Sequence, residues 1–349
     1  AIYRSECEAF GVPFQDAGVD IRALLDEAGS RGQLSPLRAT VLLARKGREH
    51  AGAFIRDLVA AAEGMDVVVG AGAQVAAPTA ADAAGVPYWF VAYTPQVLPS
   101  AHHAPFTLPF RGLHPRMNRA LWTASDRMLW AAFGSRVNAE RAHLGLPPVK
   151  EMREHFFPGG RTLLACEPEL VPVPPDLATV NATGALVLPD ARPLPPELVA
   201  FLEAGPPPVY VGFGSMTDPD PEGTTGLIMQ AVTRAGVRAV VSQGWAGLRA
   251  EQVPPHVFMA GAVSHGLLFP RVAAVVHHGG AGTTAAAARA GKPQVVVPFI
   301  FDQVEFGARV HERGLGPAPV PRSRLTVETL AARLRAVVGE PSYARRAAE

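Results

Sequence analysis

Short apolar runs rich in β-branched residues alternate along the chain with longer stretches in which apolar residues recur three or four positions apart. Runs of the first kind are typical of strands buried on both faces of a parallel sheet and lie at 66–72, 87–92, 162–166, 208–216, 238–242, 258–261, 272–276 and 294–297. Stretches of the second kind predict helices at 35–62, 73–85, 138–146, 224–235, 304–313, 325–338 and 343–349. This alternation predicts an α/β fold with parallel sheets.

A glycine-rich turn follows the apolar strand 272–276 and occupies residues 277–282. Thr283 or Thr284 is expected to cap the helix that comes next, over 285–290. Glycines let a ligand approach the backbone closely, and the N–H groups at a helix start carry roughly half a positive charge. The turn is therefore suited to bind a phosphate.

Polar side chains accompany this turn on the same edge of the predicted sheet. His278 adds a hydrogen-bond donor that can share charge with a diphosphate, and Asp302 and Gln303 follow the next strand, where they could hold hydroxyl groups. A phosphate binder beside a hydroxyl binder predicts a site for a nucleotide sugar.

Other interpretations of these motifs stay open. Residues 280–285 fit the G-x-G-x-x-A dinucleotide pattern, with Asp302 about 20 residues on. That pattern normally opens a domain, however, and its acid ends the second strand. Asp218 and Asp220 have the spacing of a metal-binding pair, although aspartate in such a loop more often caps a helix. His102 and His103 could form a base or a metal pair but have no carboxylate near them in the sequence.

The run His278-Gly279-Gly280-Ala281-Gly282-Thr283-Thr284, together with Asp302-Gln303, resembles the donor-site motif of family 1 glycosyltransferases. The bacterial natural-product and sterol-type branch is the most similar. The resemblance implies the GT-B fold, in which two Rossmann-like doubly wound domains face each other across a cleft. It also implies an inverting transfer of a hexose from a UDP- or TDP-sugar to a hydroxyl of a hydrophobic natural product or sterol-like acceptor.

Residue roles follow from the same resemblance. His278, Gly280, Gly282 and Thr283 are expected to hold the donor diphosphate, and Asp302 and Gln303 the donor sugar. Ser215, in a Phe-Gly-Ser turn, resembles the family's second phosphate contact, and the backbone near Val263 its nucleobase site. Trp245 is placed in the nucleobase region, where it stacks on the base or the sugar or else simply packs. In members of this family, the base that activates the acceptor lies in a loop after the opening strand. No residue of this sequence is expected to take that role.

The predicted domains are 1–186 for the acceptor and 208–349 for the donor, joined by a proline-rich linker over 187–207. Relative to the family, the first domain is expected to lack an opening strand and helix. Aromatic, proline and histidine residues are dense between 93 and 130, and could line an acceptor cleft or cover an ordinary core. The candidate acceptor residues are Tyr93, His102, Phe106 and Trp122.

Composition narrows the function further. The 349 residues are enough for two domains, and a net charge of +1 gives no general attraction to nucleic acid. No apolar run could span a bilayer, so stable membrane insertion is not expected. The two cysteines are too few and too far apart for a disulfide framework and lack metal-site spacing, so a reducing compartment, the cytoplasm, is the expected location. The expected partners are a nucleotide sugar and a hydrophobic small molecule, with no cofactor and no metal. The alternatives are an inactive auxiliary protein of the same fold and an NAD(P)-dependent oxidoreductase.

Overall fold

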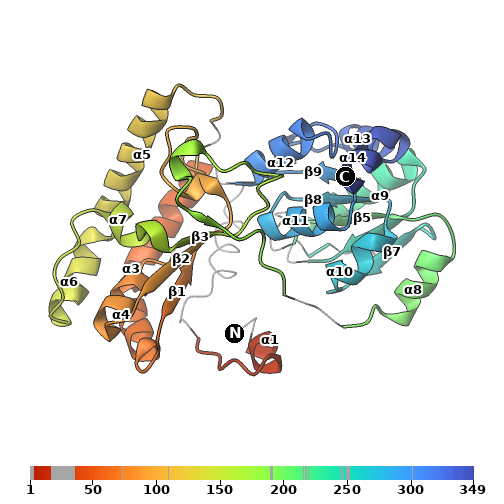
Figure 1. Cartoon of the computed structure of the whole chain (residues 1–349). Helices are drawn as coiled ribbons and strands as arrows, with labels where there is room; N and C mark the ends of the chain where they lie inside the picture. The colour runs from red at the N-terminus through yellow and green to blue at the C-terminus, as the bar shows by residue number, and fades with distance from the viewer. Residues whose placement is uncertain are drawn as a thin grey trace.

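The computed structural model describes residues 4–16, 36–72, 74–108, 110–188, 192–214, 216, 218, 220–244, 247–248, 252–300 and 302–349. These residues form two α/β units that lie side by side (Figure 1). Each unit is built on one parallel sheet, which confirms the predicted α/β class.

The first unit is a four-stranded sheet covered by helices. In chain order its elements are α1 (Arg4–Ala9), α3 (Pro36–Ala62), β1 (Val68–Ala71), α4 (Ala77–Ala84), β2 (Tyr88–Ala92), η1 (Pro95–Val97), α5 (Pro115–Leu129), η2 (Trp130–Gly134), α6 (Ser135–His143), α7 (Met152–Phe156), η3 (Gly159–Arg161), β3 (Thr162–Leu164), η4 (Pro175–Leu177) and β4 (Asn181–Ala182). The strands pair in the order β1-β2-β3-β4. Gly70 in β1 packs against β2, because an added Cβ would lie 2.8 Å from the Tyr88 hydroxyl, so close packing accounts for this glycine.

The second unit is a five-stranded sheet. Its elements are α8 (Pro196–Glu203), β5 (Val209–Gly212), α9 (Pro221–Ala235), β6 (Ala239–Ser242), β7 (Val257–Ala260), α10 (His265–Leu268), η5 (Phe269–Arg271), β8 (Ala274–His277), α11 (Ala281–Arg289), β9 (Gln294–Val296), α12 (Gln303–Glu312), η6 (Arg322–Arg324), α13 (Val327–Gly339) and α14 (Pro341–Ala348). The strand order is β7-β6-β5-β8-β9. Successive strands are added on one side of β5 up to β7 and then on the other side from β8, so the strand order reverses between β5 and β8. Open parallel sheets bind their ligands at the carboxyl ends of the strands at such a switch point.

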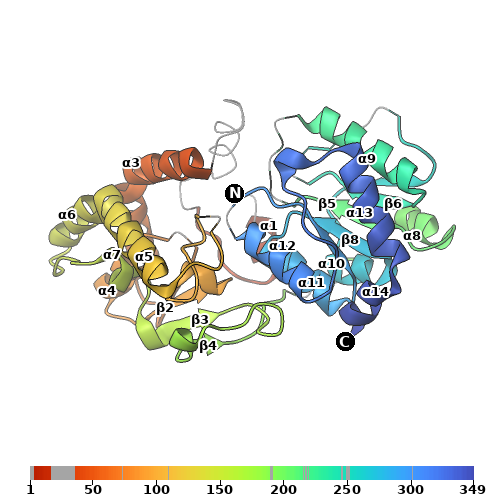
Figure 2. The same cartoon turned by 90° about the horizontal axis from the view of Figure 1, so that it is seen from above.

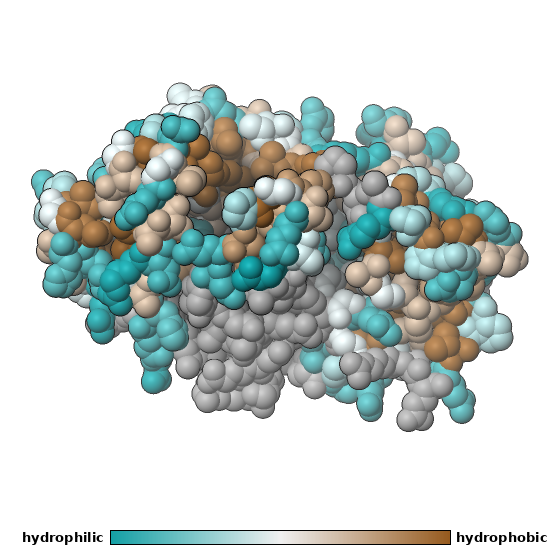
Figure 3. Space-filling model, turned by 90° about the horizontal axis from the view of Figure 1, so that it is seen from below, coloured by the Kyte–Doolittle hydropathy of each residue, from teal (hydrophilic) through white to brown (hydrophobic). Residues whose placement is uncertain are grey.

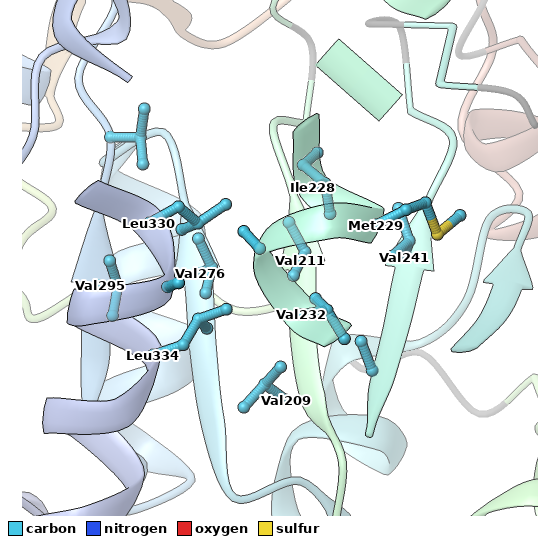
Figure 4. Packing of buried hydrophobic residues seen from close by; sticks show 14 of the residues in the cluster. Val209, Val211, Ile228, Met229, Val232, Val241, Val276, Val295, Leu330 and Leu334 are labelled. Carbon is cyan, nitrogen blue, oxygen red and sulfur yellow. The ribbon is translucent and has the colours of Figure 1, made fainter. Parts of the chain in front are cut away.

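A buried apolar cluster holds the second sheet and two of its helices together (Figure 4). Val211 and Val276 of the central strands share this cluster with Ile228 and Val232 of α9. Leu330 of α13 packs on the same face of the sheet, beside α9. Full burial of each such side chain contributes roughly 1.5–3 kcal/mol to the stability of the fold. This packing fixes the carboxyl ends of β5 and β8, from which the candidate site projects.

Helices α11 and α12 lie on the side of the second unit that faces the first, as both views show (Figures 1 and 2). Phe306 and Val310 of α12 share a buried cluster with Leu164 and Val171 of the first unit. An apolar contact therefore joins the two units beside the strand ends.

The proline-rich segment 187–207, predicted as a linker, contains the helix α8, which packs on the second sheet. Leu198 and Leu202 are buried against Tyr210 and Val240 of the second sheet. Within the described residues the helix is thus part of the second unit's core. The domain boundaries at 186 and 208 stay a prediction.

The two aspartates with metal-like spacing have structural partners. Asp220 caps α9, because its carboxylate accepts a hydrogen bond from Gly223 N at 2.9 Å. Asp218 accepts two hydrogen bonds from the Arg322 guanidinium, at 2.9 and 3.1 Å. Over the described ranges, no group of three or more His, Cys, Asp or Glu residues could hold a metal ion.

Removing the Arg322 side chain is expected to lower the free energy of unfolding by about 3–5 kcal/mol, because it leaves a buried carboxylate without its cation. The Asp218 side chain is 0% exposed in this pair. As a matched control, Arg234→Ala breaks a pair with Glu328 in which both side chains are more than half exposed, and a much smaller loss is expected because water screens this pair. Chemical denaturation of both variants measures the difference. Equal losses would contradict this account of the Asp218 pair.

No helix in the described part of the chain is long and apolar enough to cross a membrane. On the face seen from below, hydrophobic residues form separate patches among hydrophilic ones (Figure 3). That face therefore shows no continuous apolar belt over the residues that the view colours.

Candidate functional site

The first histidine of the glycine turn is structural. His277 is 0% exposed, its Nε2 lies 2.8 Å from Gln294 Oε1, and its Nδ1 accepts a hydrogen bond from Gly279 N at 3.1 Å. Burial, with a smaller contribution from the neighbouring His278, lowers the pKa of His277 to about 3. The ring is thus neutral, with its proton on Nε2, and it fixes the shape of the turn.

The second histidine has a different environment. The His278 ring packs closely on the turn after β5, since a Cβ on Gly214 would lie 2.8 Å from its Cε1. Its Nδ1 is buried without a hydrogen-bond partner among the described residues. Burial lowers the pKa of His278 to about 4, with a smaller contribution from His265. His278 is therefore a neutral donor at the switch point of the sheet.

The helix after the turn begins earlier than the sequence predicts. α11 starts at Ala281, and its cap is Gly280 with no side-chain hydrogen bond, so the expected cap by Thr283 or Thr284 is wrong. The Gly280 carbonyl accepts from both Thr284 N (3.0 Å) and Thr284 Oγ1 (2.8 Å), which turns Thr284 inward. Gly282 is exposed at the helix start, and Thr283 is half-buried. Their contact with a diphosphate stays a prediction.

Close packing requires glycine at one position of this turn. Gly279 has φ +91°, and a Cβ there would lie 2.8 Å from Val296 Cγ1 and 2.9 Å from Gln303 O. The turn after β8 is therefore pressed against the start of α12. This contact brings the predicted diphosphate group and the predicted sugar group to one edge of the sheet.

Asp302 and Gln303 begin α12 but differ in their surroundings. The Gln303 Oε1 accepts from Phe299 N (2.8 Å) and Ile300 N (3.1 Å), so this buried side chain shapes its own loop. Asp302 occupies the cap position without capping the helix, and its carboxyl group lines an open pocket. Burial raises the pKa of Asp302 to about 6, although its own backbone N–H lowers it in part. A role of either residue in holding the sugar stays a prediction.

A pocket of about 390 Å³ lies where α12 faces the loop between β2 and α5. Of the candidate acceptor residues, His102 and Phe106 line it. Trp122 does not line the pocket. It is buried and donates from Nε1 to His103 O at 3.0 Å, so it holds the loop in place from α5. Tyr93, which is 45% exposed, also lies outside the lining.

The two histidines of that loop have carboxylates near them, contrary to the expectation. Asp176, far along the chain, accepts from Ser100 Oγ and Ala101 N, both at 2.7 Å, beside His102. Burial lowers the pKa of His103, while the Ala104 carbonyl, Glu305 and Asp176 raise it in part. Sequence reasoning missed these partners because tertiary structure alone brings them together.

Charged residues on α12 were also missed, although a signal existed. Glu305, Arg309 and Glu312 recur at helical spacing and all line the pocket, with Arg111 of the opposite loop. Arg111 donates to Glu305 Oε2 at 2.7 Å and lies 2.9 Å from Glu312 Oε1. The i, i+4, i+7 pattern of alternating charge could have predicted a paired helix face.

The nucleobase region is described in part. Ser215 and Trp245 lie outside the described residues. Val263 is half-buried and lines a second pocket, of about 460 Å³, with the exposed apolar residues Val187 and Leu188. Its role at a nucleobase stays a prediction.

Known proteins are similar to this chain in sequence and in fold. Residues 227–349 match the family described as "Erythromycin biosynthesis protein CIII-like, C-terminal domain". The chain is 37% identical to the vancomycin aglycone glucosyltransferase of Amycolatopsis orientalis, over 96% of this chain and 81% of that protein. It is 34% identical to a sterol 3-beta-glucosyltransferase of Arabidopsis thaliana, over 96% of this chain and 57% of that protein.

Among solved structures, glycosyltransferase VinC in complex with DTDP aligns with a TM-score of 0.62 and 21% identity, over 98% of this chain and 83% of that one. The structural likeness shows the fold, and the sequence identity shows the family. The resemblance, the GT-B fold and the enzyme class predicted from the sequence are confirmed. The chain belongs to the GT-B glycosyltransferase family that includes the vancomycin aglycone and sterol 3-beta-glucosyltransferases.

Proposed function

We propose that the chain transfers a hexose from a UDP- or TDP-sugar to a hydroxyl of a hydrophobic natural product or sterol-like acceptor, with inversion. The observation that carries this proposal is the packing of the glycine turn after His278 against the start of α12, shown by the contact of Gly279 with Gln303. At that start of α12, Asp302 lines a pocket together with Phe106. The similarity to a vancomycin aglycone glucosyltransferase and to a sterol 3-beta-glucosyltransferase supports the acceptor class.

The chemistry follows from these groups. The acceptor oxygen attacks the anomeric carbon, its proton passes to a base, and the bond to the diphosphate oxygen breaks with both electrons on the leaving group. Charge grows on the diphosphate, where the neutral His278 N–H and the amide groups of the α11 start can stabilise it. We assign the base to none of the described residues, and we propose no metal and no cofactor.

The sugar is held at the other side of the reacting bond. Asp302 can accept hydrogen bonds from sugar hydroxyls in its carboxylate form, and its place in the lining of the pocket supports this role. The pocket combines Phe106, Leu108 and Phe110 with charged residues of α12. An acceptor with an apolar ring system and several hydroxyls fits such a lining.

Calorimetric titration with UDP, TDP, UDP-glucose and NAD⁺ in the presence of a chelator tests this function. We expect one nucleoside diphosphate to bind and NAD⁺ not to bind, because Asp302 lies at the start of α12 and does not end β9, where a ribose-binding acid would be. Binding of NAD⁺ alone would overturn the proposal. Nucleotide binding without transfer to vancomycin aglycone or a sterol would favour an inactive auxiliary protein.

A further inference from the structure

The acceptor wall of the pocket is a loop, described over residues 98–108 and 110–114, and its first part is held by hydrogen bonds. Asp176 holds Ser100 and Ala101, as described above, and Asn118 Nδ2 donates to Ala101 O at 2.9 Å. Trp122 donates to the His103 carbonyl from α5. Four hydrogen bonds, made by three residues of the first unit, therefore fix this part of the loop.

The far part of this loop is held from the second unit instead. Arg111 bridges Glu305 and Glu312, and Arg309 pairs with the same two carboxylates at 2.7 and 3.0 Å. The Glu305 side chain is 11% exposed, so the centre of this network is shielded from water. The partners raise the pKa of Arg111 and lower that of Glu312, which keeps the network charged.

The helix that receives Arg111 is also the helix that presents the sugar-binding candidates. Glu305 lies within one turn of Asp302 and Gln303 on α12. Phe106, Leu108 and Phe110 line the pocket on the stretch of loop between the anchored part and Arg111. A change in the Arg111 contact therefore moves the apolar acceptor wall relative to the donor group.

We propose that Arg111 is a positioning residue, which sets the acceptor wall against the first turn of α12 and so places the acceptor hydroxyl next to the donor sugar. This inference rests on the proposed function. It concerns the pairing of Arg111 with Glu305 and Glu312, which links the two substrate sites through one side chain.

The test compares Arg111→Gln and Arg111→Lys with a matched control, Arg56→Gln. Arg56 also pairs with a mostly buried glutamate, Glu140, at 2.7 Å, but within the first unit between α3 and α6. With vancomycin aglycone and a sterol as acceptor probes, we expect Arg111→Gln to raise the acceptor KM about tenfold, because a displaced acceptor wall loses part of its apolar contact with the acceptor. The Kd of UDP or TDP should change less than about twofold, since Arg111 touches no predicted donor group, and Arg111→Lys should restore part of the loss.

Hydrogen exchange gives a readout that needs no acceptor. Amide exchange over residues 101–114 should rise in Arg111→Gln and stay unchanged in Arg56→Gln. An acceptor KM and an exchange rate equal to the wild type in Arg111→Gln would overturn the inference alone. Failure of the wild-type chain to bind either nucleotide would overturn the proposed function, and this inference with it.

Discussion

His278→Ala is expected to reduce kcat/KM for the nucleotide sugar by about 10²–10³-fold, the usual effect of removing one donor to a developing negative charge. The fold should survive, because the buried Nδ1 of His278 has no hydrogen-bond partner among the described residues to lose. Calorimetry with UDP and TDP and a transfer assay measure the loss, and thermal unfolding checks the fold. His277→Ala serves as a contrast: it breaks the contacts with Gln294 and Gly279, so it should lower the unfolding temperature.

A substitution beside the ring tests the same role by another route. Gly280→Ala places a Cβ 2.3 Å from His278 Nε2, so the imidazole must move, whereas the backbone of Gly280, at φ −66°, accepts alanine. We expect Gly280→Ala to weaken nucleotide binding in the same direction as His278→Ala. Gly226→Ala in α9 is the matched control, because its Cβ meets no heavy atom within 4 Å. Full turnover by His278→Ala with an intact fold would refute the assignment of the diphosphate site.

The hydrophobic pattern located the described strands other than β4, but not the ends of those strands. The run 66–72 predicts a strand, and β1 covers only Val68–Ala71, because pairing with β2 begins at Val68 and Tyr88. β4 (Asn181–Ala182) has no apolar run at all, and its pairing with Leu163 and Leu164 comes from tertiary structure. Local preference therefore predicts a strand's position, and the neighbouring strand determines its length.

The candidate site divides in the same way. The turn of His278 and the start of α12 are local in sequence, so motif and resemblance located them. Helix propensity misplaced the start of α11, because glycine is a poor helix former and yet Gly282 lies inside the first turn. Arg111 and Glu305 are 194 positions apart, and Ser100 and Asp176 are 76 apart, so no pattern of one segment could predict these contacts.

The carboxyl group of Asp302 is expected to affect both the stability of the fold and the activity. Burial raises the pKa of Asp302 from 3.8 to about 6 in the folded chain. The proton is therefore held more tightly in the folded state, and the stability that it contributes is present below pH 4 and is lost as the pH rises through 6. Above that pH the wild type contains a buried carboxylate without compensation, at a cost on the order of 2 kcal/mol.

Asp302→Asn should remove that cost, so the variant should unfold at a higher temperature than the wild type at pH 7.5 and at the same temperature at pH 4. The carboxylate is the stronger acceptor for sugar hydroxyls, so donor kcat/KM should fall at least ~10-fold in the variant. The wild-type kcat/KM should decline below pH 6, and this decline should be absent from Asp302→Asn. Asp66→Asn, at an exposed position outside the pocket, is the control and should change neither profile. A wild-type kcat/KM that is flat from pH 5 to 8 would show that the ionised Asp302 is not needed. A stabilised Asp302→Asn variant with full activity would show that this carboxyl group lowers stability and has no part in binding the donor.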